Sequence, residues 1–230
     1  MFDLFNVICS QPLATARRCR TESDLIPLIK ASLLLLIVGT SSFGLVLGGA
    51  RDLSQALATA VKLPLVWIVT LALCAPAFYA IAAVFGQPWR LRALLALTLT
   101  ATARASLVLF AMLPVLWLFS DVFQSSSRFY HQLTLLASLI YATSGLAALG
   151  VLLRGFDRKL ATAPLLGLFA VVFFLVAGQT AWSLRPFVGR PSQAEVPWFR
   201  NPEGTFFEAI GRDLDSARGR YVHESQREEW

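Results

Sequence analysis

Long apolar runs, separated by short charged segments, are the dominant pattern along this chain. A helix needs about 20 mostly apolar residues to cross a hydrocarbon core roughly 30 Å thick. Four runs reach that length without a charged residue, and a fifth run contains only Arg104. The pattern therefore predicts five transmembrane helices, at about residues 31–50, 63–87, 93–120, 133–153 and 161–184.

The overall composition agrees with this pattern. Of the 230 residues, 56% are hydrophobic and 15% are charged, whereas an ordinary soluble domain has roughly 25% charged residues. This composition excludes a soluble enzyme, a disordered tail protein and a secreted disulfide scaffold. The predicted fold class is all-α: a polytopic membrane protein with a five-helix bundle at residues 31–184, between an amino-terminal segment (1–30) and a short tail (185–230).

The amino-terminal segment has apolar residues at spacings of three and four, followed by a basic cluster at Arg17, Arg18 and Arg20. This spacing predicts a helical apolar face. We expect a short amphipathic helix in the cytoplasmic interface, with its arginines toward lipid phosphates. A disordered leader with incidental phenylalanines is the alternative.

The tail is predicted to be an irregular segment followed by one short helix. Phe207, Ile210 and Leu214 recur at positions i, i+3 and i+7 and form a narrow apolar stripe. Isolated helices of this length are marginal in water. We therefore expect the stripe to dock on the membrane surface, on the bundle of this chain or on a partner protein.

Basic residues are distributed unevenly between the two sides of the predicted bundle. The amino-terminal side has nine in its short segments and the opposite loops have three. Because loops rich in Lys and Arg stay in the cytoplasm, we expect a cytoplasmic amino terminus and an extracytoplasmic tail, in the inner membrane of a bacterium. The nine are Arg17, Arg18, Arg20, Lys30, Arg90, Arg92, Arg154, Arg158 and Lys159, and the three are Arg51, Lys62 and Arg128.

The net charge of +6 comes mainly from these cytoplasmic segments, because the tail has seven basic and eight acidic residues. Basic residues beside a bilayer contact anionic headgroups. The sequence has no basic stripe with interleaved aromatic residues outside the predicted spans, so we expect no nucleic-acid binding.

Arg104 is the one charged residue inside the predicted spans, and no acidic residue occurs in them. A charge at the bilayer centre costs at least about 2.5–3.5 kcal/mol on insertion scales and is usually satisfied. Two interpretations stay open. In the first, residues 105–120 cross a thinned bilayer, Arg104 anchors at the interface and residues 91–103 form an in-plane or re-entrant helix. In the second, Arg104 serves a pore, a substrate or a partner protein. Gln179 is one candidate residue to pair with Arg104.

Small residues and prolines also predict details of packing. Two pairs of small residues four positions apart favour close helix contacts, either within one chain or between chains. Pro76 and Pro114 lie in span interiors and are expected to kink or locally unwind their helices. The pairs are Gly44 with Gly48 and Ser144 with Ala148.

The least generic stretch is the segment QTAWSLRPFVG at residues 179–189. It combines an amide in the span, an interfacial tryptophan, an arginine and a turn rich in proline and glycine. Trp182 and Arg185 suit an aromatic belt and a phosphate anchor. The candidate functional or anchoring residues are Arg104, Gln179, Trp182, Arg185, Pro186, Phe187 and Gly189, and the candidate partner-docking residues are Phe207, Ile210 and Leu214.

The predicted spans contain no Asp, Glu or His, although an intramembrane enzyme needs a nucleophile with a base, paired carboxylates or metal ligands. Cys9, Cys19 and Cys74 have no zinc-site spacing, and no phosphate-binding glycine loop is present. We therefore predict no enzymatic activity, no cofactor and no metal site.

Taken together, the Phe-rich amino-terminal segment, the five spans and the prolines in the second and third spans resemble the Yip family of membrane proteins. The ending at residues 179–189 is similar to that of uncharacterised bacterial integral membrane proteins with a QxxWxLRPFxG-type motif. The resemblance implies a non-enzymatic membrane protein that works through partners or lipid. The trafficking motifs of eukaryotic Yip relatives have no match here, so a trafficking role is not implied.

These features favour an integral membrane scaffold or accessory subunit that acts through protein partners and lipid. The alternative is a small self-assembling channel or transporter, with Arg104 and Gln179 lining the pathway.

Overall fold

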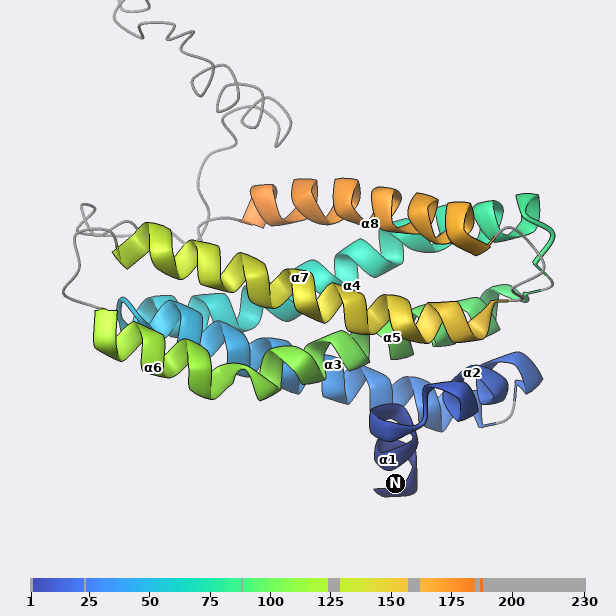
Figure 1. The fold of residues 1–230 in the computed structure, drawn as a ribbon, viewed down its shortest axis with the longest axis horizontal. Helices are drawn as coiled ribbons and strands as arrows, with labels where there is room; N and C mark the ends of the chain where they lie inside the picture. The colour runs from blue at the N-terminus through green and yellow to red at the C-terminus, as the bar shows by residue number, and fades with distance from the viewer. Residues whose placement is uncertain are drawn as a thin grey trace, which may run out of the picture.

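Helices account for all the regular structure in the part of the chain that the computed structural model describes, which is residues 2–22, 24–87, 89–123, 129–156, 162–184 and 187. They are α1 (Phe2–Ser10), α2 (Pro12–Thr21), α3 (Leu25–Gly49), α4 (Leu53–Val84), α5 (Leu91–Ala111), α6 (Leu113–Phe123), α7 (Phe129–Gly155) and α8 (Thr162–Leu184). Figure 1 shows the long helices side by side, with α8 at one side of the bundle and α1 and α2 at the other.

Five helical segments are long and apolar enough to cross a membrane. Helices α3, α4, α7 and α8 each supply one, and α5 and α6 together supply the third. The chain is therefore an all-α, polytopic membrane protein, and the predicted fold class is confirmed.

The helix α4 differs most from its predicted bounds, because it begins at Leu53 instead of residue 63. The side chain of Asp52 accepts a hydrogen bond from the backbone N of Gln55 at 2.7 Å and caps the helix. Such a cap satisfies one of the free N–H groups of the first turn, so the helix starts here although the following residues are partly polar.

The two prolines in span interiors have different effects. Pro114 is the second residue of α6, directly after a break at Met112, since α5 ends at Ala111 and α6 begins at Leu113. Helix α4 continues without interruption through Pro76, so of the two effects predicted there the local unwinding does not occur, and the kink stays a prediction. Proline removes one backbone donor, and neighbouring helices in a bundle tolerate that loss.

The packing order of the helices places α5 at the centre. Helix α3 packs on α4 and α5, α5 packs on α7, and α8 packs mainly on α4. Twelve residues of α5 are buried. Residues 91–103 and 105–111 belong to this one continuous helix, so a separate in-plane helix before Arg104 is not formed.

Two apolar clusters lie at the two ends of the bundle. One includes Leu28, Phe78 and Phe156, and it gathers the start of α3, the end of α4, the start of α5 and the end of α7. We call this the amino-terminal end. The other includes Phe43 and Leu63, and it lies where α3 ends and α4 begins, which we call the opposite end.

The amino-terminal segment is helical, as predicted, but it forms two helices that meet at Gln11. Proline at the first position of α2 fits this boundary, because the N–H that proline lacks would have no partner within the helix at that position. Val7 and Ile8 of α1 and Cys19 of α2 are buried. Helix α2 packs on α5 and α7, so this segment is in contact with protein as well as being suited to the membrane interface.

Candidate functional site

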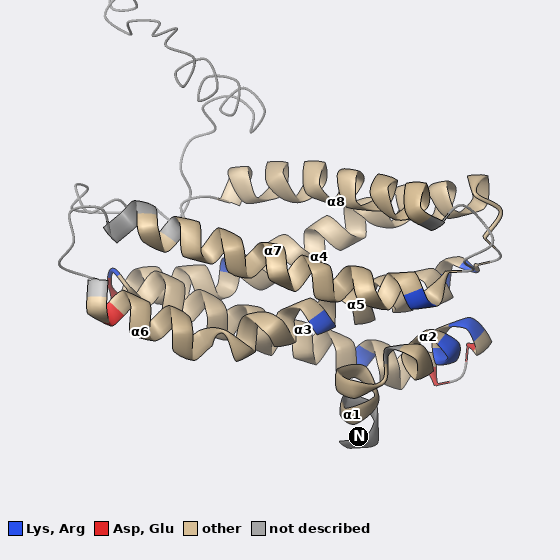
Figure 2. Cartoon of the chain, viewed as in Figure 1, with Lys and Arg blue, Asp and Glu red and all other residues tan. Residues whose placement is uncertain are grey.

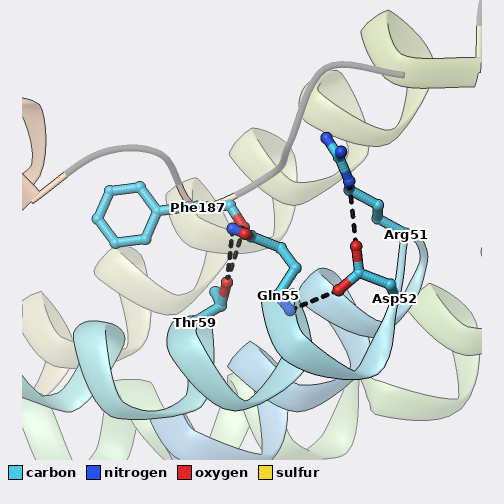
Figure 3. A network of polar contacts seen from close by, with 5 residues as sticks. All are labelled: Arg51, Asp52, Gln55, Thr59 and Phe187. Atoms are coloured by element: carbon cyan, nitrogen blue, oxygen red, sulfur yellow. Dashed lines mark hydrogen bonds and ion pairs between the residues drawn. The ribbon is translucent and has the colours of Figure 1, made fainter. Parts of the chain in front are cut away.

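A polar network at the opposite end of the bundle joins helix α4 to the start of the tail (Figure 3). The carbonyl oxygen of Phe187 accepts two hydrogen bonds, from Gln55 Nε2 at 2.8 Å and from Thr59 Oγ1 at 2.7 Å. Gln55 is 5% exposed and Thr59 is fully buried. We call these three residues the tail anchor.

The first turn of α4 positions the two donors. Gln55 and Thr59 are four residues apart, so they lie on one face of the helix. Asp52 caps this turn through the Gln55 backbone and also pairs with Arg51, whose Nε lies 3.2 Å from Asp52 Oδ2. The exposed ion pair contributes little to stability, whereas the cap sets where the helix and its donors begin.

Glycines on α3 allow its backbone to lie directly against the same turns of α4. An ideal Cβ on Gly44 would lie 2.6 Å from the Thr59 carbonyl oxygen, and one on Gly48 would lie 2.5 Å from the Gln55 carbonyl oxygen. Any larger side chain would force the helices apart. The contact predicted for the pair Gly44 and Gly48 is therefore made within one chain, and it supports the backbone from which both anchor donors project.

Phe187 also contributes its ring to this end of the bundle, where it packs against the cluster that contains Phe43 and Leu63. A buried carbonyl without a donor costs about 1–3 kcal/mol. The two donors remove that cost, while the ring adds apolar contact. Phe187 thus fixes the start of the tail to the bundle, whereas the membrane-anchoring role expected of the ending stays a prediction.

The other residues of the ending have different outcomes. Gln179 and Trp182 lie in the last turns of α8, half-buried, and both have interaction partners. Arg185, Pro186 and Gly189, and the stripe Phe207, Ile210 and Leu214, lie outside the described residues.

Arg104 lies on α5, the central helix, and is partly buried. Its Nη1 atom is enclosed and has no hydrogen-bond partner within the described residues. Gln179 is on α8, which packs on α4 and to a lesser extent on α7. Helix α5, which carries Arg104, makes little direct contact with α8, and the pairing of Arg104 with Gln179 stays a prediction.

A second polar cluster holds α2 at the amino-terminal end. Arg20 Nη2 donates to the Gly155 carbonyl oxygen at 3.1 Å, and its guanidinium lies 5.4 Å from the ring centroid of Trp89. Arg90 Nη1 forms an ion pair with Glu22 at 3.1 Å. At least one of the arginines expected to face lipid phosphates, Arg20, therefore contacts the protein.

The cluster around Trp89 continues into the bundle through aromatic rings. Trp89 packs edge-on to Phe156 at 6.0 Å between centroids, Phe156 packs edge-on to Phe169 at 5.5 Å, and Phe169 stacks on Phe78 at 4.4 Å. Aromatic pairs of this geometry add about 0.5–1.5 kcal/mol beyond their buried area. These rings thus connect α4 and α8 to the residues that directly precede α5 and follow α7.

Sequence reasoning missed Gln55, Thr59 and Trp89. The signal for the first two was present: Asp52 followed three residues later by Gln55 resembles the start of a capped helix. A polar pair at i and i+4 directly after that signal marks a buried polar face. Trp89 had no such signal, since its role depends on where α2 and α7 end in space.

The chemistry available among the described residues is hydrogen bonding and apolar packing. Among them, no three His, Cys, Asp or Glu side chains come together in a way that could hold a metal ion. Burial raises the pKa of the Cys19 thiol to about 12, with a smaller opposing effect from a hydrogen bond with Thr100. A thiol of this kind is protonated at neutral pH and inert.

The architecture and the tail anchor define a class, the polytopic helical membrane protein. Comparisons with protein-family models, curated proteins and solved structures find no match to this chain. The resemblance to the Yip family and to bacterial proteins with a similar ending therefore stays a prediction.

Proposed function

We propose that this chain is an integral membrane scaffold or accessory subunit that presents its tail to a partner protein. The tail anchor carries this proposal. Two buried donors on α4 hold the Phe187 carbonyl, so the tail starts from a fixed point on the tightly packed α3–α4 pair. A fixed starting point limits the positions open to the following residues, which lowers the entropy cost of binding.

The composition of the tail supports a protein partner. It has seven basic and eight acidic residues, a balance that offers little attraction to an anionic membrane surface. The stripe Phe207, Ile210 and Leu214 provides an apolar face. A narrow apolar face with charges of both signs around it suits a groove on another protein.

The distribution of charge supports an orientation with the amino terminus in the cytoplasm of a bacterial cell. Figure 2 shows Lys and Arg gathered around α2 and the adjacent ends of α5 and α7. Basic residues beside a span favour the cytoplasmic side. In this orientation, the tail anchor lies at the extracytoplasmic surface of the inner membrane.

The channel alternative rests on Arg104, whose enclosed Nη1 has no partner in the described part of the chain. Such a group suits a pathway formed between copies of the chain. The alternative has weaker support because Gln179, the second expected lining residue, is on α8, which packs mainly on α4 and makes little direct contact with α5.

The test is purification of the full chain from native membranes in mild detergent, followed by native mass spectrometry. We expect a different polypeptide at fixed stoichiometry. The double variant Gln55→Leu and Thr59→Val removes both anchor donors and is expected to lower retention of that polypeptide at least about fivefold, the equivalent of roughly 1 kcal/mol. The triple variant Phe207→Ser, Ile210→Ser and Leu214→Ser is expected to abolish it.

Matched controls separate these effects from general damage. Thr40 is fully buried like Thr59, but its hydroxyl donates to Leu36 of its own helix at 2.7 Å, so Thr40→Val is expected to retain the partner. In the tail, Glu208→Ser with Arg212→Ser changes residues beside the stripe and is expected to retain it too. Unchanged retention in the triple variant contradicts the proposal. A homo-oligomer that conducts ions in liposomes replaces it with the channel.

A further inference from the structure

A groove lies between α4, α5, α7 and α8 and encloses a volume of about 250 Å³. Its walls are apolar and include the rings of Trp67, Phe78 and Phe169. The hydroxyls of its two threonines, Thr98 and Thr102, donate to carbonyls of their own helix at 3.1 and 2.9 Å. Neither threonine therefore offers a free hydroxyl to an occupant, and the groove suits an apolar one.

The groove opens sideways, toward the outside of the bundle. Helices α5 and α7 pack together and α4 and α8 pack together, but contacts between the two pairs are sparse. Leu146, on its rim, is 69% exposed, and Ala142 and Ala170 are exposed as well. In a chain that spans a membrane, such a side opening faces bilayer lipid.

The length of the groove matches one leaflet of a bilayer. Its lining extends from Trp67 to Phe78 on α4, about 16 Å at 1.5 Å per residue, and from Ala142 to Leu152 on α7, about 15 Å. Half of a hydrocarbon core is also about 15 Å thick. The lining runs from the middle of these helices toward the amino-terminal end, so it covers the leaflet on that side.

Basic side chains stand at the same end as this leaflet. Arg154 follows Leu152 by two residues and is exposed, and Arg20 and Arg90 lie at the adjacent ends of α2 and α5. The groove lining itself includes no charged residue. This arrangement complements a lipid with an anionic phosphate beside an apolar chain.

We propose that the groove holds one acyl chain of a phospholipid from the leaflet at the amino-terminal end, with its phosphate near the basic side chains there. The proposal does not depend on a protein partner at the tail. A lipid bound in this way becomes part of the bundle, because its acyl chain fills the space between the α5–α7 pair and the α4–α8 pair.

The test uses the full chain in vesicles of phosphatidylethanolamine and phosphatidylglycerol that contain a phospholipid with a photoreactive group in its acyl chain. An ideal Cβ on Gly145, which lines the groove, meets no atom within 4 Å. Gly145→Leu therefore adds an apolar side chain to the groove lining at a position where its Cβ has room. We expect photolabelling of the groove walls on α7 and α8, lowered at least about tenfold by this substitution.

Gly167→Leu is the matched control. Gly167 lies on α8, has the same open space around its ideal Cβ and does not line the groove. The control is expected to keep the wall labelling. Both substitutions replace a helical glycine by a better helix former. If Gly145→Leu fails to assemble, Ala170→Leu fills the groove from the opposite wall and is expected to give the same loss.

Native mass spectrometry of the purified chain identifies the occupant. Retention of one phospholipid mass per chain, lost in Gly145→Leu and kept in Gly167→Leu, supports the proposal. Wall labelling that is equal in both variants overturns it, because only the general lipid annulus is then being labelled. A retained free fatty acid, or a polypeptide released by Gly145→Leu, overturns it by naming another occupant.

Discussion

At the scale of single residues, several buried hydroxyls in this bundle donate to backbone carbonyls. Ser106 Oγ lies within hydrogen-bonding distance of Ala103 of its own helix, at 2.7 Å, and of Leu35 on α3, at 3.0 Å. Thr59 reaches the Phe187 carbonyl in the same way. Since hydrocarbon supplies no acceptor, a buried donor without one costs several kcal/mol. A contact of this kind gives the hydroxyl an acceptor and joins two elements of the bundle at the same time.

Cys9 and Cys19 provide a residue-scale prediction about the docking of α2. Cys9 is exposed, whereas Cys19 is fully buried and burial raises its pKa from 9.0 to about 12. The thiolate is the reactive form, so at pH 8 Cys19 has about a thousandfold less of it than an ordinary thiol. We expect a maleimide to modify Cys9 within minutes and to leave Cys19 intact, as measured by peptide mass spectrometry.

The same raised pKa predicts a pH effect on stability with a definite sign. Below about pH 9 the Cys19 thiol is protonated in both the folded and the unfolded chain, so the full stability is present. Between about 9 and about 12 the unfolded thiol loses its proton first, and stability falls as the pH rises. In Cys19→Ala this part of the loss disappears. Rapid maleimide modification of Cys19 at pH 8 contradicts a docked α2.

The ending motif shows what could be predicted from the residues and what could not. Phe187 stood out because its segment combines a tryptophan, an arginine and prolines at the end of a span. Its partners Gln55 and Thr59 precede the second apolar run, where hydropathy predicts a connecting loop and not a helix. Residues that lie 128 or more positions apart in the sequence are brought together by helix packing, which a pattern along one chain does not specify.

At the scale of elements, apolar length predicts that a span exists, and local capping decides where it begins. All five spans were predicted from long apolar runs, one of which contains Arg104, and all five are present. Helix α4 starts early because Asp52 caps it. Hydropathy alone misses this kind of boundary, since a capped polar turn can pack against a helix with glycines on its face.

The contact between α3 and α4 leads to a prediction in which two neighbouring glycines behave in opposite ways. An ideal Cβ on Gly48 would lie 2.5 Å from the Gln55 carbonyl oxygen, whereas one on Gly49 would lie 3.8 Å from the nearest atom, the Ala56 Cβ. Gly48→Ala is expected to destabilise the chain by about 1–3 kcal/mol through overpacking. Gly49→Ala is expected to be neutral or slightly stabilising.

Denaturation of both variants in detergent, followed by helical circular dichroism, measures this difference. The two substitutions add the same methyl group in the last turn of one helix, so any effect of composition or expression is shared. Equal stabilities show that α3 and α4 do not approach this closely. If Gly48→Ala lowers the stability and also weakens the hydrogen bonds to the Phe187 carbonyl, the glycine contact supports the tail anchor.

At the scale of the whole molecule, the two ends of the bundle differ in kind. The amino-terminal end gathers basic side chains, the docked α2 and the aromatic rings around Trp89. The opposite end has the tail anchor beside the capped start of α4. An odd number of spans separates the amino-terminal segment from the tail, so each end of the molecule has one terminal segment.

The number of spans and the charge bias were predictable from the sequence. The order in which the helices pack was not, because it depends on contacts such as those of Gly39 with Ser106.

The charge bias between these ends predicts how the chain lies in a cell. Moving the basic residues of α2 and the α4–α5 turn across the bilayer is costly, so the amino-terminal end is expected to stay in the cytoplasm. In a bacterium that expresses the chain with Ser192→Cys, a membrane-impermeant maleimide is expected to label position 192 in intact cells and to reach the exposed Cys9 only after the inner membrane is permeabilised. The buried Cys19 and Cys74 are expected to stay unlabelled in both conditions and serve as the internal control. Labelling of Cys9 but not of position 192 in intact cells reverses the orientation, and it moves the tail anchor and its partner to the cytoplasmic side.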